Sequence, residues 1–239
     1  MEEKIKKFKH ISVLLNECIE NLNIKSNGIY LDGTLGGAGH SIEIVKKLDK
    51  KGILIGVDRD EEALQAAKNK LQDFNNIKYI QANHDDIKSI IQSLEIDKLD
   101  GILLDLGVSS YQIDEEKRGF SYMHDAILDM RMDLTQKLDA KEVVNTYEEE
   151  ELARIIYEYG EERFSRQIAK NICEYRKETE IETTKQLVDI IERSIPYSKR
   201  EKGSHPAKKT FQAIRIEVNN EIEPLYNTVL DCIECLNKG

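Results

Sequence analysis

The 239-residue sequence predicts an α/β protein with a doubly wound parallel sheet and an all-helical insertion. Short apolar strands alternate with helical stretches over the first 106 residues, and this order is typical of parallel strand pairing. The alternation then stops, because residues 107–135 are polar without a clear period and residues 140–195 have helical periodicity. A chain of this length suits one large domain that carries an insertion.

The first strand and the loop after it predict a nucleotide-type pocket. An apolar run at residues 28–31 ends at Asp32, and a helical stretch follows at residues 41–48. Four of the chain's 13 glycines lie between them, at Gly33, Gly36, Gly37 and Gly39. Glycine permits positive φ and lets the backbone approach a ligand, and the next helix begins with free amides. An ordinary glycine-rich turn remains the alternative interpretation.

The glycine spacing argues against two common phosphate-binding loops. A dinucleotide fingerprint needs glycines at i, i+2 and i+5, but when the count starts at Gly37 the third position is Ile42. A P-loop needs a lysine directly after its last glycine, whereas the first lysine after this loop is Lys46. An adenosyl ligand without a phosphate fits better, and S-adenosylmethionine is the common one.

Asp58 follows the second predicted strand, at residues 52–57, and precedes a helix at residues 61–71. It lies 19 residues after Gly39, and an acid about 20 residues past a glycine loop is placed to bind ribose hydroxyls. Helix capping is the structural alternative for Asp58, but Asp60 is better placed for that role. We therefore expect Asp58 to bind ribose and Asp60 to cap the helix.

A third strand is predicted at residues 77–81, and a fourth at residues 99–106. The fourth run is almost continuously apolar, which is typical of a central strand that is buried on both faces. Asp105 lies at its carboxyl end, and ligands of open parallel sheets bind beyond that edge. We therefore expect Asp105 to share one crevice with the glycine loop and Asp58.

The turn after the fourth strand holds the candidate catalytic groups, which are the carboxylate of Asp105 and the hydroxyls of Ser109 and Ser110. Enzymes that methylate amino groups commonly hold the target amine here. An aromatic amino nitrogen is a poor nucleophile because its lone pair is delocalised, and acceptors for its N–H groups let it pyramidalise. Holding the nitrogen in line with the methyl group lowers the activation barrier by ~7–11 kcal/mol. A ligand-binding role for Asp105 without proton chemistry is an equal alternative.

A net charge of −10 argues against a general nucleic-acid binder. The charge is uneven, because residues 196–209 carry five basic side chains against one acid, Glu201. These five candidates for RNA-phosphate contacts are Lys199, Arg200, Lys202, Lys208 and Lys209. A second basic stretch covers residues 163–177. A solvated face without a partner is the alternative for both stretches.

The apolar pattern and the cysteines predict a cytoplasmic protein without a membrane segment or a metal site. No apolar run approaches the ~20 residues of a membrane span, and the N-terminus lacks the apolar core of a signal peptide. Four scattered cysteines without an export signal indicate free thiols in a reducing compartment. Cys232 and Cys235 form one C-x-x-C pair in a helical pattern, and no second pair completes a zinc site.

Several longer motifs together resemble one family. They are the segments at residues 10–15 (HISVLL), 32–41 (DGTLGGAGHS), 105–110 (DLGVSS), 118–121 (RGFS), 128–133 (LDMRMD), 159–164 (YGEERF) and 205–213 (HPAKKTFQA). With these motifs the sequence resembles the bacterial ribosomal small-subunit methyltransferase H family, also called MraW. The resemblance implies a Rossmann-like, S-adenosylmethionine-dependent methyltransferase fold and N4-methylation of a cytidine in the decoding region of 16S rRNA. It also implies a helical insertion that helps to recognise RNA.

The resemblance also implies cofactor contacts, carried over by position. Six of them fall on Ala38, Gly39, His40, Asp58, Asp105 and Gln112. A seventh falls on His84, where the family usually has Phe; a histidine ring still stacks on adenine but is smaller and titratable. Tyr111 stands where the family typically has Pro.

We expect residues 1–110 and 206–239 to form the methyltransferase domain and residues 111–205 to form the helical insertion. The family continues with another strand beyond its final helix, so C-terminal strands of the sheet are expected to be missing. Two alternatives stay open: a shortened form that binds cofactor and RNA with weak or no activity, and a methyltransferase of another substrate such as DNA. The expected partners are 16S rRNA and the small ribosomal subunit, and the oligomeric state, including a homodimer, stays open.

Overall fold

A computed structural model describes residues 12–109, 112–113 and 115–238. The chain divides into two compact units. The first, here called the sheet unit, comprises residues 1–110 and 226–239, and the second, the helical unit, comprises residues 111–225. Residues 206–225, which were predicted to belong to the methyltransferase domain, lie in the helical unit.

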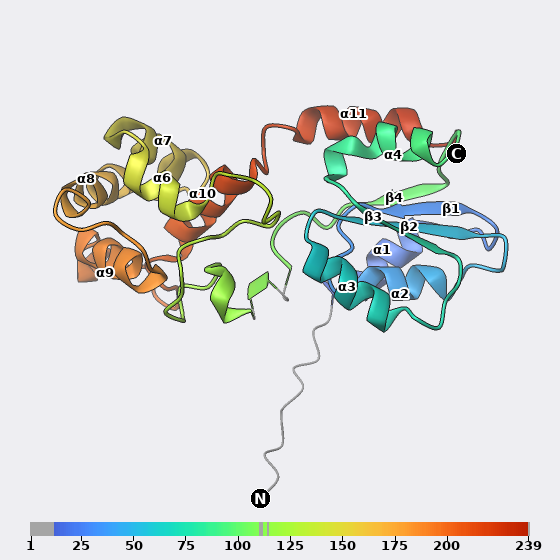
Figure 1. Cartoon of the computed structure of the whole chain (residues 1–239), viewed down its shortest axis with the longest axis horizontal. Coiled ribbons are helices and arrows are strands. Elements are labelled where there is room, and N and C mark those ends of the chain that lie inside the picture. The colour runs from blue at the N-terminus through green and yellow to red at the C-terminus, as the bar shows by residue number, and fades with distance from the viewer. Residues whose placement is uncertain (1–11, 110–111, 114, 239) are drawn as a thin grey trace, which may run out of the picture. The chain divides into compact units, whose positions relative to one another are not determined.

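The described part of the sheet unit contains four parallel strands in the order β3-β2-β1-β4 (Figure 1). Their bounds are β1 (Ile29–Asp32), β2 (Ile53–Asp58), β3 (Ile77–Gln81) and β4 (Gly101–Leu103). The chain proceeds outward from β1 to β2 and β3, then returns to pair β4 on the other side of β1. This reversal creates a topological switch point between β1 and β4, where ligands of such sheets bind.

Helices cover both faces of the sheet, so the doubly wound, Rossmann-like prediction is confirmed (Figure 1). One face carries α1 (Leu15–Asn21), α2 (Gly39–Val45) and α3 (Glu61–Lys70). The other face carries α4 (Ile87–Ser93) and α11 (Leu225–Cys235). Helix α2 starts two residues earlier than predicted, because Ala38 takes a left-handed conformation and turns the chain directly into the helix.

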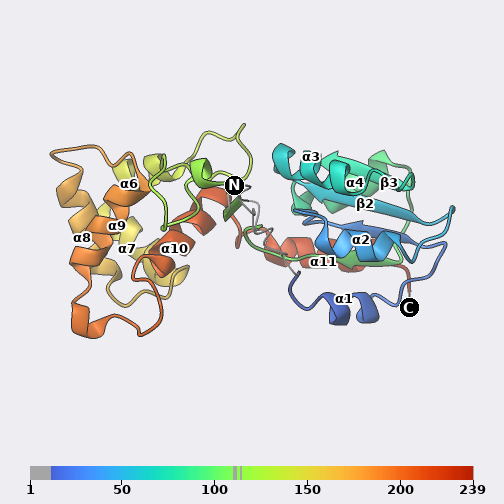
Figure 2. The same ribbon diagram turned by 90° about the horizontal axis from the view of Figure 1, so that it is seen from below.

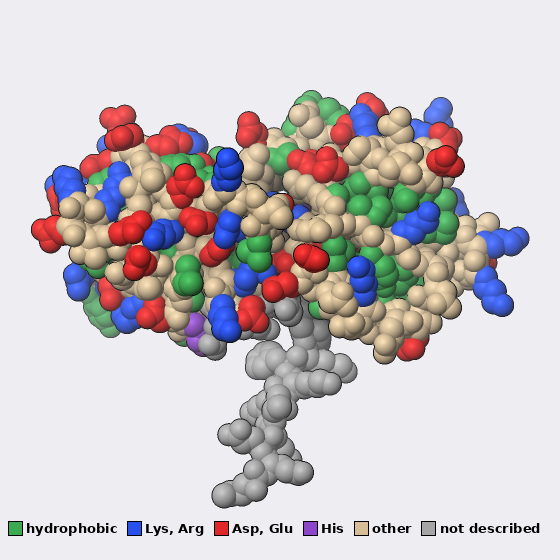
Figure 3. Space-filling view, in the orientation of Figure 1, with side chains coloured by type: hydrophobic (Ala, Val, Ile, Leu, Met, Phe, Trp, Pro, Cys, Tyr) green, Lys and Arg blue, Asp and Glu red, His purple; other side chains and the backbone are tan. Residues whose placement is uncertain are grey.

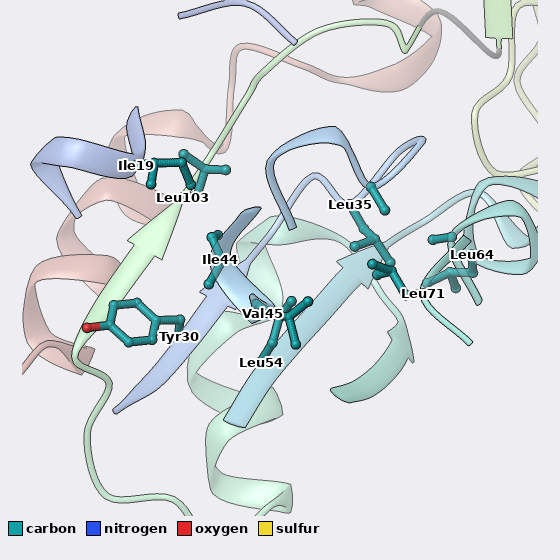
Figure 4. Packing of buried hydrophobic residues seen from close by; sticks show 11 residues of the cluster. Ile19, Tyr30, Leu35, Ile44, Val45, Leu54, Leu64, Leu71 and Leu103 are labelled. Atoms are coloured by element: carbon teal, nitrogen blue, oxygen red, sulfur yellow. The ribbon is translucent and has the colours of Figure 1, made fainter. Parts of the chain in front are cut away.

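Alternate strand residues build the two apolar layers of this unit. Tyr30 and Leu54 point toward α1, α2 and α3, where they lie among helix residues such as Ile44 (Figure 4). Leu31 and Ile55 point to the opposite face, toward α4 and α11. Because both faces are buried, the strands read as continuous apolar runs rather than as alternating ones.

The C-x-x-C pair belongs to this second layer. Cys232 and Cys235 are free, buried thiols that pack with Ile87 and Ile90 of α4. Burial raises the pKa of Cys232 to about 11, so this thiol stays protonated near neutral pH. The pair therefore contributes apolar surface to the core.

The fourth strand differs from its prediction. It spans three residues and lies at an edge of the four-strand sheet, whereas the apolar run had predicted a long central strand. The chain after Leu103 leaves the ladder, because the amide of Asp105 donates to the hydroxyl of Thr34 at 2.6 Å. On the other side a single bridge joins Leu99 to Leu236. Hydrophobic side chains gather on the surface where Figure 1 draws β4 (Figure 3).

The helical unit contains α6 to α10, which group together in Figure 2. They are α6 (Ala140–Thr146), α7 (Glu149–Glu158), α8 (Ser165–Tyr175), α9 (Thr184–Ser194) and α10 (Lys208–Asn219). Side chains fix two of the helix starts: Asp139 accepts from the amide of Glu142, and Thr183 forms a capping box with Gln186. Helix α10 packs against α6 and α7, and this long-range contact explains why residues 206–225 belong here.

Part of the polar segment between β4 and α6 is fixed to α10 by buried polar groups. The amide nitrogen of Asn219 donates to the carbonyl of Met130 at 2.7 Å, and its oxygen accepts from the amide of Met132 at 2.8 Å. Arg118 donates to the carbonyl of Arg131 at 2.7 Å, and Arg131 forms a bidentate pair with Asp129. The LDMRMD motif is thus an ordered part of the helical unit. None of the described helices is long and apolar enough to cross a membrane.

Candidate active site

The glycine loop begins at a buried carboxylate. Asp32, 1% exposed at the end of β1, accepts from the hydroxyl of Ser41 at 2.6 Å and from the amide of Thr34 at 3.1 Å. Burial raises the pKa of Asp32, and these two hydrogen bonds oppose the rise. Asp32 joins the first turn of the loop to α2, so it shapes the pocket. Asp32 is not among the predicted site residues, although an acid directly before a glycine loop is a signal that the sequence contains.

Three glycines set the course of the loop. Gly36 has a φ of 45°, which favours glycine, and a Cβ there would lie 3.4 Å from the Cβ of Ser109. A Cβ on Gly39 would collide with the hydroxyl of Ser12, so the N-terminal segment packs directly on the loop. A Cβ on Gly37 would meet no described atom within 4 Å, and the loop therefore keeps an open side at this point.

Asp58 connects the loop to the end of β2. One of its oxygens accepts from the amide of Gly36 at 2.7 Å, and the other accepts from the amide of Asp60 at 2.9 Å. Burial raises the pKa of Asp58 to about 6, against the effect of both amides. The carboxylate is therefore ionised at pH 7 and above and retains lone pairs for hydroxyl donors. Asp60 caps α3 through the amide of Glu62 at 3.1 Å, which confirms that prediction.

Asp105 lies beside the loop with its side chain 51% exposed. Its amide is held by Thr34, as described above, and its carboxylate oxygen lies 3.8 Å from the Nδ1 atom of His40. The other ring nitrogen of His40 lies 3.0 Å from the carbonyl oxygen of Val13, which can only accept, so Nε2 carries a proton. His40 is thus a buried link between the N-terminal segment and the exposed carboxylate.

The remaining predicted cofactor and catalytic residues have different positions. Ala38 is buried at the start of α2, and Ser109 lies against Gly36. His84 is buried after β3. A Cβ added to Gly33 would lie 3.5 Å from the Cβ of His84, so His84 reaches the start of the loop. Gln112 is buried in the helical unit. Ser110 lies outside the described residues.

The five predicted RNA-contact residues fall into two groups. Arg200 donates to the carbonyls of Glu192 and Ile195 at the end of α9, and Lys209 pairs with Glu201 at 2.7 Å. Lys199, Lys202 and Lys208 form no ion pair with any described residue. Three of the five cations are therefore available to a partner.

The chain matches the family model described as the MraW methylase family over residues 7–239. It belongs to the MraW methylase family. Among curated relatives of this methylase, the ribosomal RNA small subunit methyltransferase H of Clostridium botulinum (strain Kyoto / Type A2) is 58% identical over 231 residues. The protein of the same name from Clostridioides difficile (strain 630) is 53% identical over 233 residues. These matches cover 97% of this chain and 74% and 75% of the relatives.

Solved structures show a more distant likeness to this methylase. An rRNA methylase from Streptococcus thermophilus is 17% identical, with a TM-score of 0.34, over 49% of this chain and 70% of that chain. A protein-L-isoaspartate O-methyltransferase is 14% identical, with a TM-score of 0.34, over 48% of this chain and 35% of that chain.

The methyl donor of this methylase is S-adenosylmethionine, and the residues of the loop fit it. Asp58 offers free lone pairs to ribose hydroxyls, and Gly37 leaves room along the loop backbone. The exposed carboxylate of Asp105 suits a positively charged group of the cofactor or an amino group beside it. Asp58 ends β2, the loop follows β1 and Asp105 follows β4, and these three neighbouring strands end at the edge where such sheets bind ligands.

The raised pKa of Asp58 predicts a pH-dependent stability. Below about pH 4 this carboxyl is protonated in both the folded and the unfolded chain, and its contribution is fully present. As the pH rises from about 4 to the folded pKa of about 6, the carboxyl ionises in the unfolded chain before it does in the folded one, and the free energy of unfolding falls by about 2–3 kcal/mol. Urea unfolding of the wild type and of Asp58→Asn between pH 4.5 and 7.5 measures this difference. A stability difference that does not change with pH contradicts the prediction.

Proposed function

We propose that the protein transfers the methyl group of S-adenosylmethionine to N4 of a cytidine in the decoding region of 16S rRNA, acting on the small ribosomal subunit in the cytoplasm. The observation that carries this proposal is the exposed carboxylate of Asp105 beside the glycine loop of a methylase. Relatives at 53–58% identity are named ribosomal RNA small subunit methyltransferase H, which supports the ribosomal substrate.

Binding of the cofactor is assigned to the loop and to Asp58. The ionised carboxylate of Asp58 accepts the ribose hydroxyls while it keeps the amides of Gly36 and Asp60 in place. His84, at the start of the loop, is assigned to the adenine ring. When bound, the cofactor supplies a methyl group on a positively charged sulfur.

Asp105 is assigned to the target base. Its carboxylate accepts an N–H of the cytosine amino group, so that nitrogen pyramidalises and directs its lone pair at the methyl carbon. The nitrogen would lose one proton as it gains the methyl group and the methyl–sulfur bond breaks, and Asp105 is assigned as the acceptor of that proton. The hydroxyl of Thr34 holds the backbone amide of Asp105, and the ring of His40 lies beside its carboxylate. Ser109, which lies against Gly36, adds a hydroxyl beside the same loop.

The base has to leave its stack to reach this site. The helical unit is assigned to RNA recognition, with Lys199, Lys202 and Lys208 as the cations free for phosphate contacts. Arg200 and Lys209, the other two candidates, retain intramolecular partners, and their contribution to RNA binding is expected to be smaller.

A methylation assay tests the proposal. The purified chain is incubated with tritiated cofactor and with small ribosomal subunits, free 16S rRNA, DNA or total cell extract, and modified nucleotides are mapped by mass spectrometry. The proposal requires label on N4 of a decoding-region cytidine. Label only on DNA or a small molecule would identify another substrate. Calorimetric binding of the cofactor without turnover on any substrate would favour the alternative, a cofactor- and RNA-binding form.

A further inference from the structure

The helical unit contains a solvent-open hollow of about 160 Å³ that the methyl-transfer site does not use. The YGEERF segment, the end of α9 and the start of α10 surround it. The titratable side chains that line it are five basic ones, Arg163, Lys199, Arg200, His205 and Lys209, and two acids, Glu162 and Glu201.

The charges of this hollow do not cancel. Lys209 pairs with Glu201, and Glu162 accepts the amide of Phe164 at 2.9 Å. The hydrogen bond from Lys209 lowers the pKa of Glu201, and the charge of Arg163 adds to this effect, which places Arg163 close by. Arg163 and Lys199 are exposed and form no ion pair with any residue in the described part of the chain. Two positive charges therefore remain in a protein whose net charge is −10.

The start of α10 adds further attraction for an anion. This helix has 12 residues, and no side chain caps its first turn. The first of its amides, that of Lys208, donates to the carbonyl of His205 at 3.1 Å, and the amides that follow in the first turn carry a partial positive charge. The Nδ1 atom of His205 accepts from the amide of Ala207 at 3.2 Å, so the ring proton lies on Nε2, which is 3.8 Å from a carboxylate oxygen of Glu192.

Close contacts fix these groups before any ligand arrives. A Cβ on Gly160 would lie 2.5 Å from the carbonyl oxygen of Lys209, so the segment that carries Arg163 lies directly on α10. Gln212 of α10 donates to the carbonyl of Tyr159 at 3.0 Å. The ring of His205 stacks on Tyr122, with centroids 4.6 Å apart. The geometry of the hollow is thus set by the fold of the helical unit alone.

We propose that this hollow binds a backbone phosphate of the RNA substrate. Arg163 presents a planar fork that matches two phosphate oxygens, Lys199 adds a point charge, and the first turn of α10 adds amide donors. The inference rests on the proposed function for its source of phosphate, and it adds Arg163, from the second basic stretch, to the five predicted RNA-contact residues. A phosphate here positions the RNA without reading its sequence.

The test compares Arg163→Met and Lys199→Met with Lys185→Met. Lys185 is an exposed lysine near the start of α9, roughly 15 Å along that helix from the hollow, and it pairs with Asp189. Fluorescence anisotropy measures the affinity for a decoding-region RNA hairpin at several salt concentrations. Each variant of the hollow should bind several-fold more weakly, and its log–log salt slope should be shallower by about 0.7–0.9. Lys185→Met should match the wild type.

Two further measurements separate this inference from the proposed function. Circular dichroism and cofactor calorimetry should be unchanged in all three variants, because the substituted side chains are exposed. If the wild type binds and methylates rRNA while both variants of the hollow keep its salt slope, the inference is overturned and the proposed function stands. If the slopes change but no rRNA is methylated, the phosphate site stands and the proposed function fails. A wild type that does not bind the hairpin overturns the phosphate site, and the methylation assay on small ribosomal subunits decides the proposed function.

Discussion

Replacement of Asp105 by alanine is expected to lower kcat for rRNA methylation by about 100-fold or more. The side chain is the exposed carboxylate beside the glycine loop. Two roles are proposed for it: it aligns the amino group and it takes up the proton of that group. General-base catalysis typically contributes 10²–10⁴-fold, and loss of alignment adds to that. Single-turnover kinetics with saturating cofactor and ribosomal subunits measure the effect.

Asp105→Asn separates the two roles. The amide can still accept a hydrogen bond but cannot take up a proton, so an alignment role predicts a mild loss and a base role predicts a loss as large as that of alanine. Asp97→Ala is the control, because this exposed acid precedes β4 at the opposite end of the strand. A normal kcat in Asp105→Ala would remove Asp105 from the chemistry.

Replacement of Asp58 by alanine is expected to weaken cofactor binding by about 100-fold. Hydrogen bonds to a charged group contribute about 1.5–3 kcal/mol each, and Asp58 is assigned as the acceptor of the ribose hydroxyls. The variant also leaves the amides of Gly36 and Asp60 without their acceptor, so the loop loses its anchor to β2. Because the ionised carboxylate is the acceptor, the affinity of the wild type should also fall below about pH 6. Isothermal titration calorimetry measures both effects.

Asp49→Ala is the matched control for Asp58→Ala. Asp49 also accepts two backbone amides, those of Lys51 at 2.7 Å and Gly52 at 3.3 Å, but it lies before β2, at the opposite edge of the sheet. Its loss should perturb a turn without changing cofactor affinity. Equal losses of affinity in the two variants would show that Asp58 acts only through the general stability of the sheet.

Local patterns in the sequence predicted most of the sheet unit. Strand β3 has the predicted bounds, β1 and β2 differ by about a residue, and Asp60 caps α3 as expected. These features depend on short apolar runs, turn residues and helix caps, which neighbouring residues determine. The acids at the carboxyl ends of strands could also be predicted, because a parallel sheet brings those ends to one edge.

Long-range contacts account for what the sequence did not predict. The apolar run at residues 99–106 does not reveal that the amide of Asp105 bonds Thr34 in place of a strand neighbour. The apolar face of α10 does not show which helices it packs on, so residues 206–225 were placed in the wrong unit. The link from Val13 through His40 to Asp105 joins residues far apart in the sequence, and no local pattern predicts it.

A crystal structure of the protein with S-adenosylhomocysteine tests the central claim most directly. We expect ribose hydroxyls about 3 Å from the carboxylate of Asp58, the backbone of the glycine loop along the ligand, and the sulfur on the side of Asp105. A nucleoside bound away from the ends of β1, β2 and β4, or one that touches neither Asp58 nor Asp105, would contradict it.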